Sequence, residues 1–312
     1  MSESETSLRV AIVVPVRNGG EVWRRAAEAI LQQIRRPDRV LVVDSESSDG
    51  SDALALRCGF ELRRILVRDF DHGGTRRLAA EQCADCDVLV YLTHDAVLAD
   101  AGALGRLLRA FDDPRVAVAY GRQLPRPGAG PIEAHARLFN YPPASARRSL
   151  ADAARLGMKA AFSSDSFCAY RRSALEMVGN FPARAIGSED MVVAARVLQH
   201  GLTVAYVADA CVFHSHAYTA LQELRRYFDI GVLHAQESWL LRELGAPEGE
   251  GLRFVLSEAR YLLARAPCLL PVAALRTAGK LLGYRLGRRH ADLSEAWRLR
   301  LSMHRGFWSR GR

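Results

Sequence analysis

The sequence has 312 residues, 49% of them hydrophobic and 25% charged, which is the composition of an ordinary globular protein. Its net charge is +8, but residues 251–312 carry thirteen Arg or Lys against three acidic residues, so the first 250 residues sum to −2. This distribution argues against a nucleic-acid-binding core. It favours a basic C-terminal region that contacts an acidic surface, such as anionic lipid headgroups.

The N-terminal residues carry no recognisable targeting signal. Residues 1–7 are polar and acidic and lead into an apolar segment without the basic-then-apolar order of a signal peptide. No apolar run reaches the length of a bilayer span. Six cysteines are scattered without the spacing of a disulfide framework. These features predict a cytoplasmic protein.

Strands and helices are predicted to alternate over the first hundred residues. Buried strands are expected at 9–15, 40–43, 64–67 and 88–92. Three helices separate them: one at 21–33, a second that ends near residue 58, and a third at 75–83. Strict alternation predicts parallel crossover units, and therefore an α/β sheet with flanking helices.

The pattern becomes less regular beyond residue 95. A helix is expected at 101–111 and a strand at 116–120, followed by a Pro- and Gly-rich loop over the crevice at 123–143, an antiparallel strand at 162–170, a helix from 172, a helix at 191–199 and short strands at 203–207 and 211–213. From 221 onward the pattern is helical and amphipathic, with breaks near 245–250 and 267–271.

Polar side chains follow the predicted strands where each strand ends. Since the carboxyl ends of parallel strands open onto the ligand crevice, those that follow the first four strands are expected to face one pocket. The Gly73-Gly74 turn before a helix, with Arg76 and Arg77 beside it, predicts a cradle for a diphosphate. The spacings of a Walker loop and of a dinucleotide fingerprint are absent, which argues against a P-loop NTPase and a dehydrogenase.

Four blocks in order resemble an inverting family 2 glycosyltransferase with a GT-A fold, over about residues 8 to 235. The blocks are Val-Pro-Val-Arg-Asn at 14–18, Val-Val-Asp-Ser-Glu-Ser-Ser-Asp-Gly-Ser at 42–51, Leu-Thr-His-Asp at 92–95 and Gly-Ser-Glu-Asp at 187–190. Segments 70–76, 214–218 and 226–231 resemble the bacterial rhamnosyltransferases. Those enzymes use dTDP-L-rhamnose and build O-antigen or other cell-surface polysaccharides on a lipid-linked acceptor.

The resemblance implies a GT-A domain at 1–235, with a nucleotide-sugar half at 8–120 and an acceptor half at 121–235. The apolar and Arg-rich pattern of the remaining residues predicts a basic amphipathic helical region at 236–312. The resemblance also implies a nucleotide-sugar donor site. The residues assigned to that site are Pro15, Val16, Arg17, Asn18, Asp44, Ser45 and Glu46 for base and ribose, and His72, Gly73, Gly74, Arg76, His94 and Asp95 for the rest of the donor.

The same resemblance implies a divalent metal. Asp95 matches the second acid of the family's Asp-x-Asp motif, which binds Mg²⁺ or Mn²⁺ bridging the diphosphate oxygens. Thr93 stands where the first acid usually is, so the ion would rely on Asp95, the diphosphate, waters and His214. His214 and His216 would share one face of a strand.

Asp190 matches the family's catalytic base, with Glu189 as a substitute base or an acceptor-positioning group. Direct displacement at the anomeric carbon needs a carboxylate that takes the acceptor hydroxyl's proton. From the residues alone, both acids also fit the first turn of a helix, where the helix dipole favours negative charge.

The expected function is transfer of L-rhamnose from dTDP-L-rhamnose to a glycan or lipid-linked acceptor, with inversion, at the inner membrane face. The alternatives are another donor such as a UDP-hexose, or a sugar-nucleotide-binding protein without catalysis, which the missing acid at Thr93 suggests. Residues 251–312 are expected either to lie in a membrane interface or to pack on the catalytic domain or in a dimer.

Overall fold

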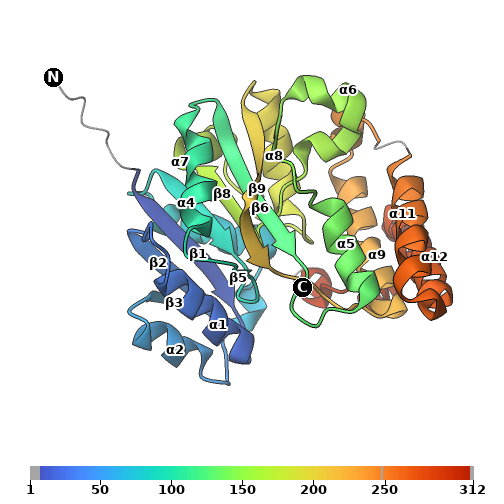
Figure 1. The fold of residues 1–312 in the computed structure, drawn as a ribbon, viewed down its shortest axis with the longest axis horizontal. Helices are drawn as coiled ribbons and strands as arrows, with labels where there is room; N and C mark the ends of the chain where they lie inside the picture. Colours follow the sequence, from blue (N-terminus) through green and yellow to red (C-terminus); the bar gives the residue numbers. More distant parts are fainter. Residues whose placement is uncertain (1–7, 247–248, 310–312) are drawn as a thin grey trace.

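A single mixed β-sheet runs through the computed structural model, which describes residues 8–246 and 249–309 (Figure 1). The strands are β1 (Val10–Val16), β2 (Arg39–Ser45), β3 (Glu61–Ile65), β4 (Val88–Leu92), β5 (Val97–Leu98), β6 (Val116–Leu124), β7 (Ala146–Arg148), β8 (Phe167–Arg171) and β9 (Thr203–Phe213). Their order in the sheet is β3-β2-β1-β4-β8-β6-β9-β5, with β7 paired to β9.

Helices flank both faces of this sheet and continue into the C-terminal part. They are α1 (Gly20–Leu31), α2 (Ser51–Arg57), α3 (His72–Gln82), α4 (Ala103–Leu108), α5 (Pro131–Asn140), α6 (Ala153–Leu156), α7 (Arg172–Met177), α8 (Glu189–Gln199), α9 (Ala220–Gln236), α10 (Trp239–Leu244), α11 (Glu250–Arg265), α12 (Leu270–Arg288), α13 (Glu295–Leu301) and α14 (Arg305–Ser309).

The first four main strands form the parallel half of the sheet, as the alternating pattern predicts. β1 pairs in parallel with β2 and β4, and β2 with β3. Successive residues of β1 point to opposite faces. Ala11 and Val13 pack in the cluster that holds α3 and α8, while Val10, Ile12 and Val14 pack in the cluster that holds α1 and α4.

The second half of the sheet is mixed. β8 lies antiparallel to both β4 and β6, and β6 runs parallel to β9. The predicted antiparallel strand is therefore confirmed over Phe167–Arg171, and the α/β fold class with flanking helices is confirmed. Because β4 stands next to β8, the residues that follow β4 face those that precede β8.

Three segments differ from the predicted pattern. Segment 123–143 is not a continuous loop, because Pro131 occupies the first turn of α5, where its missing N–H is no loss. The third strand begins at Glu61 and not at residue 64. Its charged residues do not fit the pattern of a buried strand, but an edge strand tolerates them. β9 is one strand with an irregularity opposite Gly121 and Arg122, rather than two.

The C-terminal helices pack on the rest of the chain. α12 lies along α9 so closely that a Cβ added at Gly283 would be 2.1 Å from the Leu224 carbonyl oxygen, and one at Gly287 would be 2.0 Å from that of Phe228. On α11, Phe254 contacts the Phe139 ring of α5 with centroids 5.1 Å apart. In the described part of the chain no helix combines the length and apolar content needed to cross a bilayer.

Candidate active site

A cavity of about 440 Å³ opens at the carboxyl ends of β1, β2 and β4. Six of the residues predicted to bind the donor line it: Pro15, Val16, Arg17, Ser45, His72 and His94. They come from segments that are far apart in sequence, and the parallel half of the sheet brings them together. The structure thus brings six of the thirteen residues predicted to bind the donor into one concave site.

Three other predicted residues do not line this cavity but form hydrogen bonds in the loops around it. The Asn18 side chain accepts a hydrogen bond from the Ser48 backbone at 2.8 Å and joins the loops after β1 and β2. Glu46 accepts one from the backbone of Val67, which lines the cavity. Asp44 is buried, and its Oδ1 atom has no hydrogen-bond partner among residues 8–246 and 249–309, although its Oδ2 accepts from Ser47.

The Gly73-Gly74 pair lies inside α3 and does not form a turn before it. The helix begins at His72, and the N-cap Asp71 accepts a hydrogen bond from the Gly74 N–H at 2.8 Å. A Cβ at Gly73 would be 2.0 Å from the carbonyl oxygen of Pro182. The prediction of a diphosphate cradle at these amides is therefore wrong for Gly74, and Gly73 permits close packing of α3.

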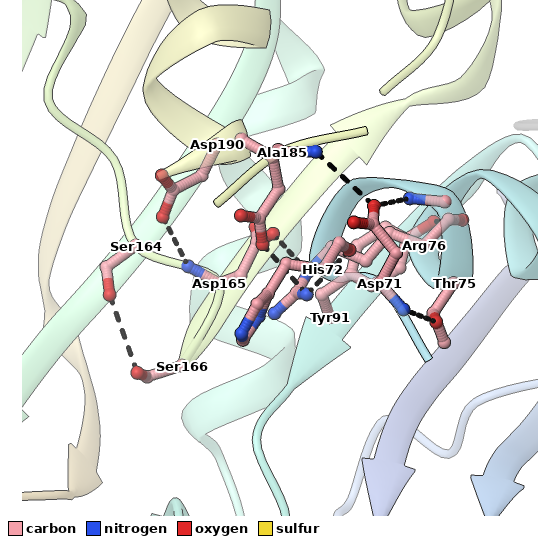
Figure 2. A network of polar contacts seen from close by, with 12 residues as sticks. Asp71, His72, Thr75, Arg76, Tyr91, Ser164, Asp165, Ser166, Ala185 and Asp190 are labelled. Atoms are coloured by element: carbon pink, nitrogen blue, oxygen red, sulfur yellow. Dashed lines mark hydrogen bonds and ion pairs between the residues drawn. The ribbon is translucent and has the colours of Figure 1, made fainter. Parts of the chain in front are cut away.

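Arg76 lies under the site and does not reach into the donor cavity. Its side chain is 6% exposed, and it pairs through Nε with Asp165 at 2.5 Å (Figure 2). Through Nη1 it also pairs with Glu189 at 2.8 Å. Nη1 also donates to the His72 carbonyl oxygen at 3.0 Å. The guanidinium therefore joins α3, the segment before β8 and the start of α8, and it lines the adjoining cavity of Asp190 instead of the donor cavity.

Asp190 faces a second cavity of about 250 Å³ together with Asp165, Glu189 and Arg226. Its Oδ2 accepts a hydrogen bond from the Asp165 backbone at 3.2 Å. His72 lines both this cavity and the donor cavity, so the two adjoin. Asp165 and Arg226 were not among the predicted site residues, because nothing in the sequence places them next to the acids of α8.

Three carboxyl groups, of which Asp165 and Glu189 are buried and Asp190 is half-buried, share the single charge of Arg76, and their pKa values separate. Burial, with the charges of Asp165 and Glu189, raises the pKa of Asp190 well above its ordinary value. Burial likewise raises the pKa of Asp165 to about 6. Burial opposes ionisation of Glu189 as well, but the Arg76 charge prevails and lowers its pKa. The shifts favour Glu189 as the ionised partner of Arg76, whereas burial favours the protonated form of Asp190.

Asp95, His214 and His216 form a cluster whose ligand atoms lie within 4.8 Å of one another. Asp95 follows β4 and the two histidines follow β9, so the sheet brings together residues more than a hundred positions apart. Although burial opposes it, the hydrogen bond with His214 lowers the pKa of Asp95. Burial lowers the pKa of His214, and lowers that of His216 to about 4, so both rings are neutral at pH 7.

Arg126 Nη2 already pairs with Asp95 Oδ2 at 2.9 Å, so a bound cation would have to use the other carboxylate oxygen, Oδ1, which faces His214. His214 Nδ1 lies 3.0 Å from Gln123 Oε1, and its Nε2 lies 3.4 Å from Asp95 Oδ1. A neutral imidazole carries a proton on only one of its two nitrogens, so the unprotonated nitrogen faces an oxygen to which it cannot donate a hydrogen bond. A divalent ion at Nε2 removes this conflict. One carboxylate with two imidazoles suits Mn²⁺ better than Mg²⁺, which prefers oxygen ligands.

Comparison with known proteins agrees with this geometry. Residues 11–179 match the family described as Glycosyl transferase family 2. The chain is 43% identical to the O-antigen chain rhamnosyltransferase RfbN of Salmonella typhimurium, over 97% of this chain and 96% of that protein. It is 41% identical to the O-antigen chain rhamnosyltransferase WbaN of Salmonella anatum, over 96% and 95%.

Solved structures share the fold at low identity. The mannosyltransferase PcManGT from Pyrobaculum calidifontis, in complex with GDP-Man and Mn²⁺, aligns with a TM-score of 0.57 and 20% identity, over 98% of this chain and 86% of that one. TarS of S. aureus in complex with UDP-GlcNAc aligns with a TM-score of 0.52 and 14% identity, over 91% and 92%.

The chain therefore belongs to glycosyl transferase family 2. It is a glycosyltransferase with a GT-A-like fold, as the four sequence blocks predicted.

The burial of Arg76 predicts a large difference between neighbouring arginines. Arg76→Gln leaves buried carboxylates without their counter-charge and should lower the free energy of unfolding by about 3–5 kcal/mol. The control is Arg77→Gln, which removes an exposed pair with Glu81 and should change it by no more than about 0.5 kcal/mol. Urea unfolding measures both. Equal stability of the two variants would contradict the network.

Proposed function

We propose that the protein transfers L-rhamnose from dTDP-L-rhamnose to a glycan or lipid-linked acceptor of a cell-surface polysaccharide, with inversion. The observation that carries the proposal is the position of Asp190 in a cavity that adjoins the donor cavity at His72. The choice of sugar is supported by the names of the two Salmonella relatives, which match nearly the whole chain.

In this proposal the nucleoside lies beside Arg17 and Ser45, and the sugar extends past His72 toward Asp190. The carboxylate of Asp190 takes the proton of the acceptor hydroxyl as that oxygen forms a bond to the anomeric carbon. The bond from this carbon to the diphosphate breaks on the opposite side, and the nucleoside diphosphate leaves. Glu189 and Asp165, fixed by Arg76, orient the turn that carries the base.

We also propose that Asp95, His214 and His216 hold Mn²⁺ or Mg²⁺. Such an ion would neutralise charge on the departing diphosphate. His216 takes the place of the carboxylate that Thr93 lacks.

Replacing Asp190 by Asn should lower the rate of rhamnosyl transfer by at least about 10²-fold, the usual contribution of a general base. The Kd for dTDP should stay within about twofold, because the amide keeps the size of the side chain. Asp209→Asn, a change at an exposed carboxylate of β9, serves as the control. Substantial residual transfer by Asp190→Asn would rule out the base assignment.

In the unmodified enzyme the raised pKa of Asp190 adds a pH signature. The base is inactive when protonated, so kcat/KM should fall as the pH drops through a midpoint well above 4.

The donor and metal assignments are tested together by thermal unfolding with nucleotides. With Mn²⁺ present, dTDP should raise the Tm more than UDP does, and removing the ion should reduce both shifts. His216→Ala should lose most of the dependence on Mn²⁺, whereas His200→Ala, at the exposed end of α8, should keep it. A larger shift by UDP would favour a UDP-hexose donor. Shifts by either nucleotide without any turnover would favour the binding-protein alternative.

We further propose that the protein acts at the cytoplasmic membrane face through α11 and α12. Three leucines of α11 form one stripe and are 64%, 48% and 61% exposed: Leu252, Leu256 and Leu263. On α12, Leu275 and Leu282 are also exposed. Arginines such as Arg253 and Arg260 accompany them. Apolar side chains edged by cations suit an anionic lipid surface.

Flotation with vesicles containing anionic lipid tests this surface. The triple variant Leu252→Gln, Leu256→Gln, Leu263→Gln should float at least several-fold less than the unmodified chain. The control, Ile34→Gln with Leu56→Gln, changes equally exposed apolar residues of the nucleotide-sugar half and should float normally. Flotation that is the same for all three proteins would remove the membrane proposal.

A further inference from the structure

The C-terminal segment 302–307 forms one wall of the donor cavity. Met303, His304, Arg305, Gly306 and Phe307 line it together with residues at the ends of β1 and β2. These positions come after two long helices in sequence, and no motif in the four family-like blocks includes them. The donor site is therefore built from both ends of the described chain.

The segment is fixed to α9 by a buried carboxyl group. Asp229 accepts hydrogen bonds from the Ser302 hydroxyl at 2.7 Å, from the Met303 N–H at 2.8 Å and from the His304 N–H at 3.2 Å. Ser302 is 1% exposed and Asp229 is 5% exposed. A buried carboxylate that accepts three hydrogen bonds from residues 302–304 fixes the backbone there, and with it the position of His304.

His304 lies at the boundary between the two cavities. It lines the donor cavity and also the cavity of Asp190, as His72 does. His304 Nδ1 is 3.2 Å from His72 Nε2, and the two rings meet edge to face with centroids 4.5 Å apart. A Cβ added at Gly187, in the turn before the catalytic acids, would be 3.8 Å from His304 Nε2.

We propose that His304, held by Asp229 and His72, donates a hydrogen bond from Nε2 to the diphosphate of the donor where it joins the sugar. This inference rests on the proposed function, because it assumes a nucleotide-sugar that runs from the donor cavity toward Asp190. The link between diphosphate and sugar must pass the wall that the two cavities share, and His72 and His304 form that wall.

The hydrogen-bond pattern is consistent within the pair. When His72 Nε2 donates to His304 Nδ1, the single proton of the neutral His304 ring lies on Nε2, on the side toward the turn at Gly187. A donor already in place, at a site where negative charge grows as the bond to the sugar breaks, stabilises the transition state without reorganisation.

Calorimetric titration with dTMP, dTDP and dTDP-L-rhamnose, each with Mn²⁺, tests the contact. His304→Ala should weaken dTDP and dTDP-L-rhamnose by about tenfold, the loss of one hydrogen bond to a charged group, and change dTMP by less than about twofold. His304→Gln, which keeps a donor, should recover part of the loss. His200→Ala, a histidine at the exposed end of α8, should bind all three as the unmodified protein does.

Ser302→Ala tests the anchor. It should lower the ratio of dTDP to dTMP affinity by a few-fold in the unmodified protein and have no further effect when combined with His304→Ala, because both changes act through one contact. A purely structural role would add the two effects.

Two results would overturn the inference. If His304→Ala binds dTDP like the unmodified protein, or weakens all three nucleotides equally, His304 does not contact the diphosphate. If the unmodified protein itself binds no nucleoside diphosphate, the proposed function fails, and the inference fails with it. The first failure is seen only by comparing His304→Ala with the unmodified protein, whereas the second is seen in the unmodified protein alone.

Discussion

The buried charge of Arg76 is the interaction on which the active site depends. A guanidinium with 6% of its side chain exposed is stable only beside carboxylates, and Asp165 and Glu189 supply them from two other segments. The same charge lowers the pKa of Glu189, while burial keeps the pKa of Asp190 high. One cation therefore fixes the start of α8 and leaves one of its acids with a raised pKa.

The two cavities meet on one side of this network. α3 carries both Arg76, which pairs with the acids, and His72, which lines both cavities, so a single helix positions the two groups. On the far side, Asp229 holds the C-terminal segment that completes the wall. The packing of α12 on α9 brings that segment back across the molecule, which gives the C-terminal helices a part in the donor site besides any contact with a membrane.

The sequence predicts the parallel half of the fold well, because buried strands such as Val10–Val16 alternate with helices and end in polar residues. It also predicts Asp95 and Asp190 from motif blocks. The roles of Gly73, Gly74 and Arg76 could not be predicted in this way. The sequence Gly-Gly-Thr-Arg fits both a turn and the first turn of a helix, and only the structure shows that Asp71 caps a helix there. The spacing of His216 from His214 indicates that the two share a face, but Asp165 and His304 enter the site only through tertiary contacts, which carry no local signal.

The central claim is that the two adjoining cavities form one cleft for the donor, which runs past His72 and His304 to Asp190, and that the diphosphate binds an ion held by the metal cluster. A crystal structure of the protein with dTDP-L-rhamnose and Mn²⁺, using Asp190→Asn to prevent turnover, tests this most directly. The account predicts the nucleoside beside Arg17 and Ser45, the ion on Asp95, His214 and His216, and the anomeric carbon facing residue 190. A nucleotide bound outside this cleft, or a sugar directed away from residue 190, would contradict it.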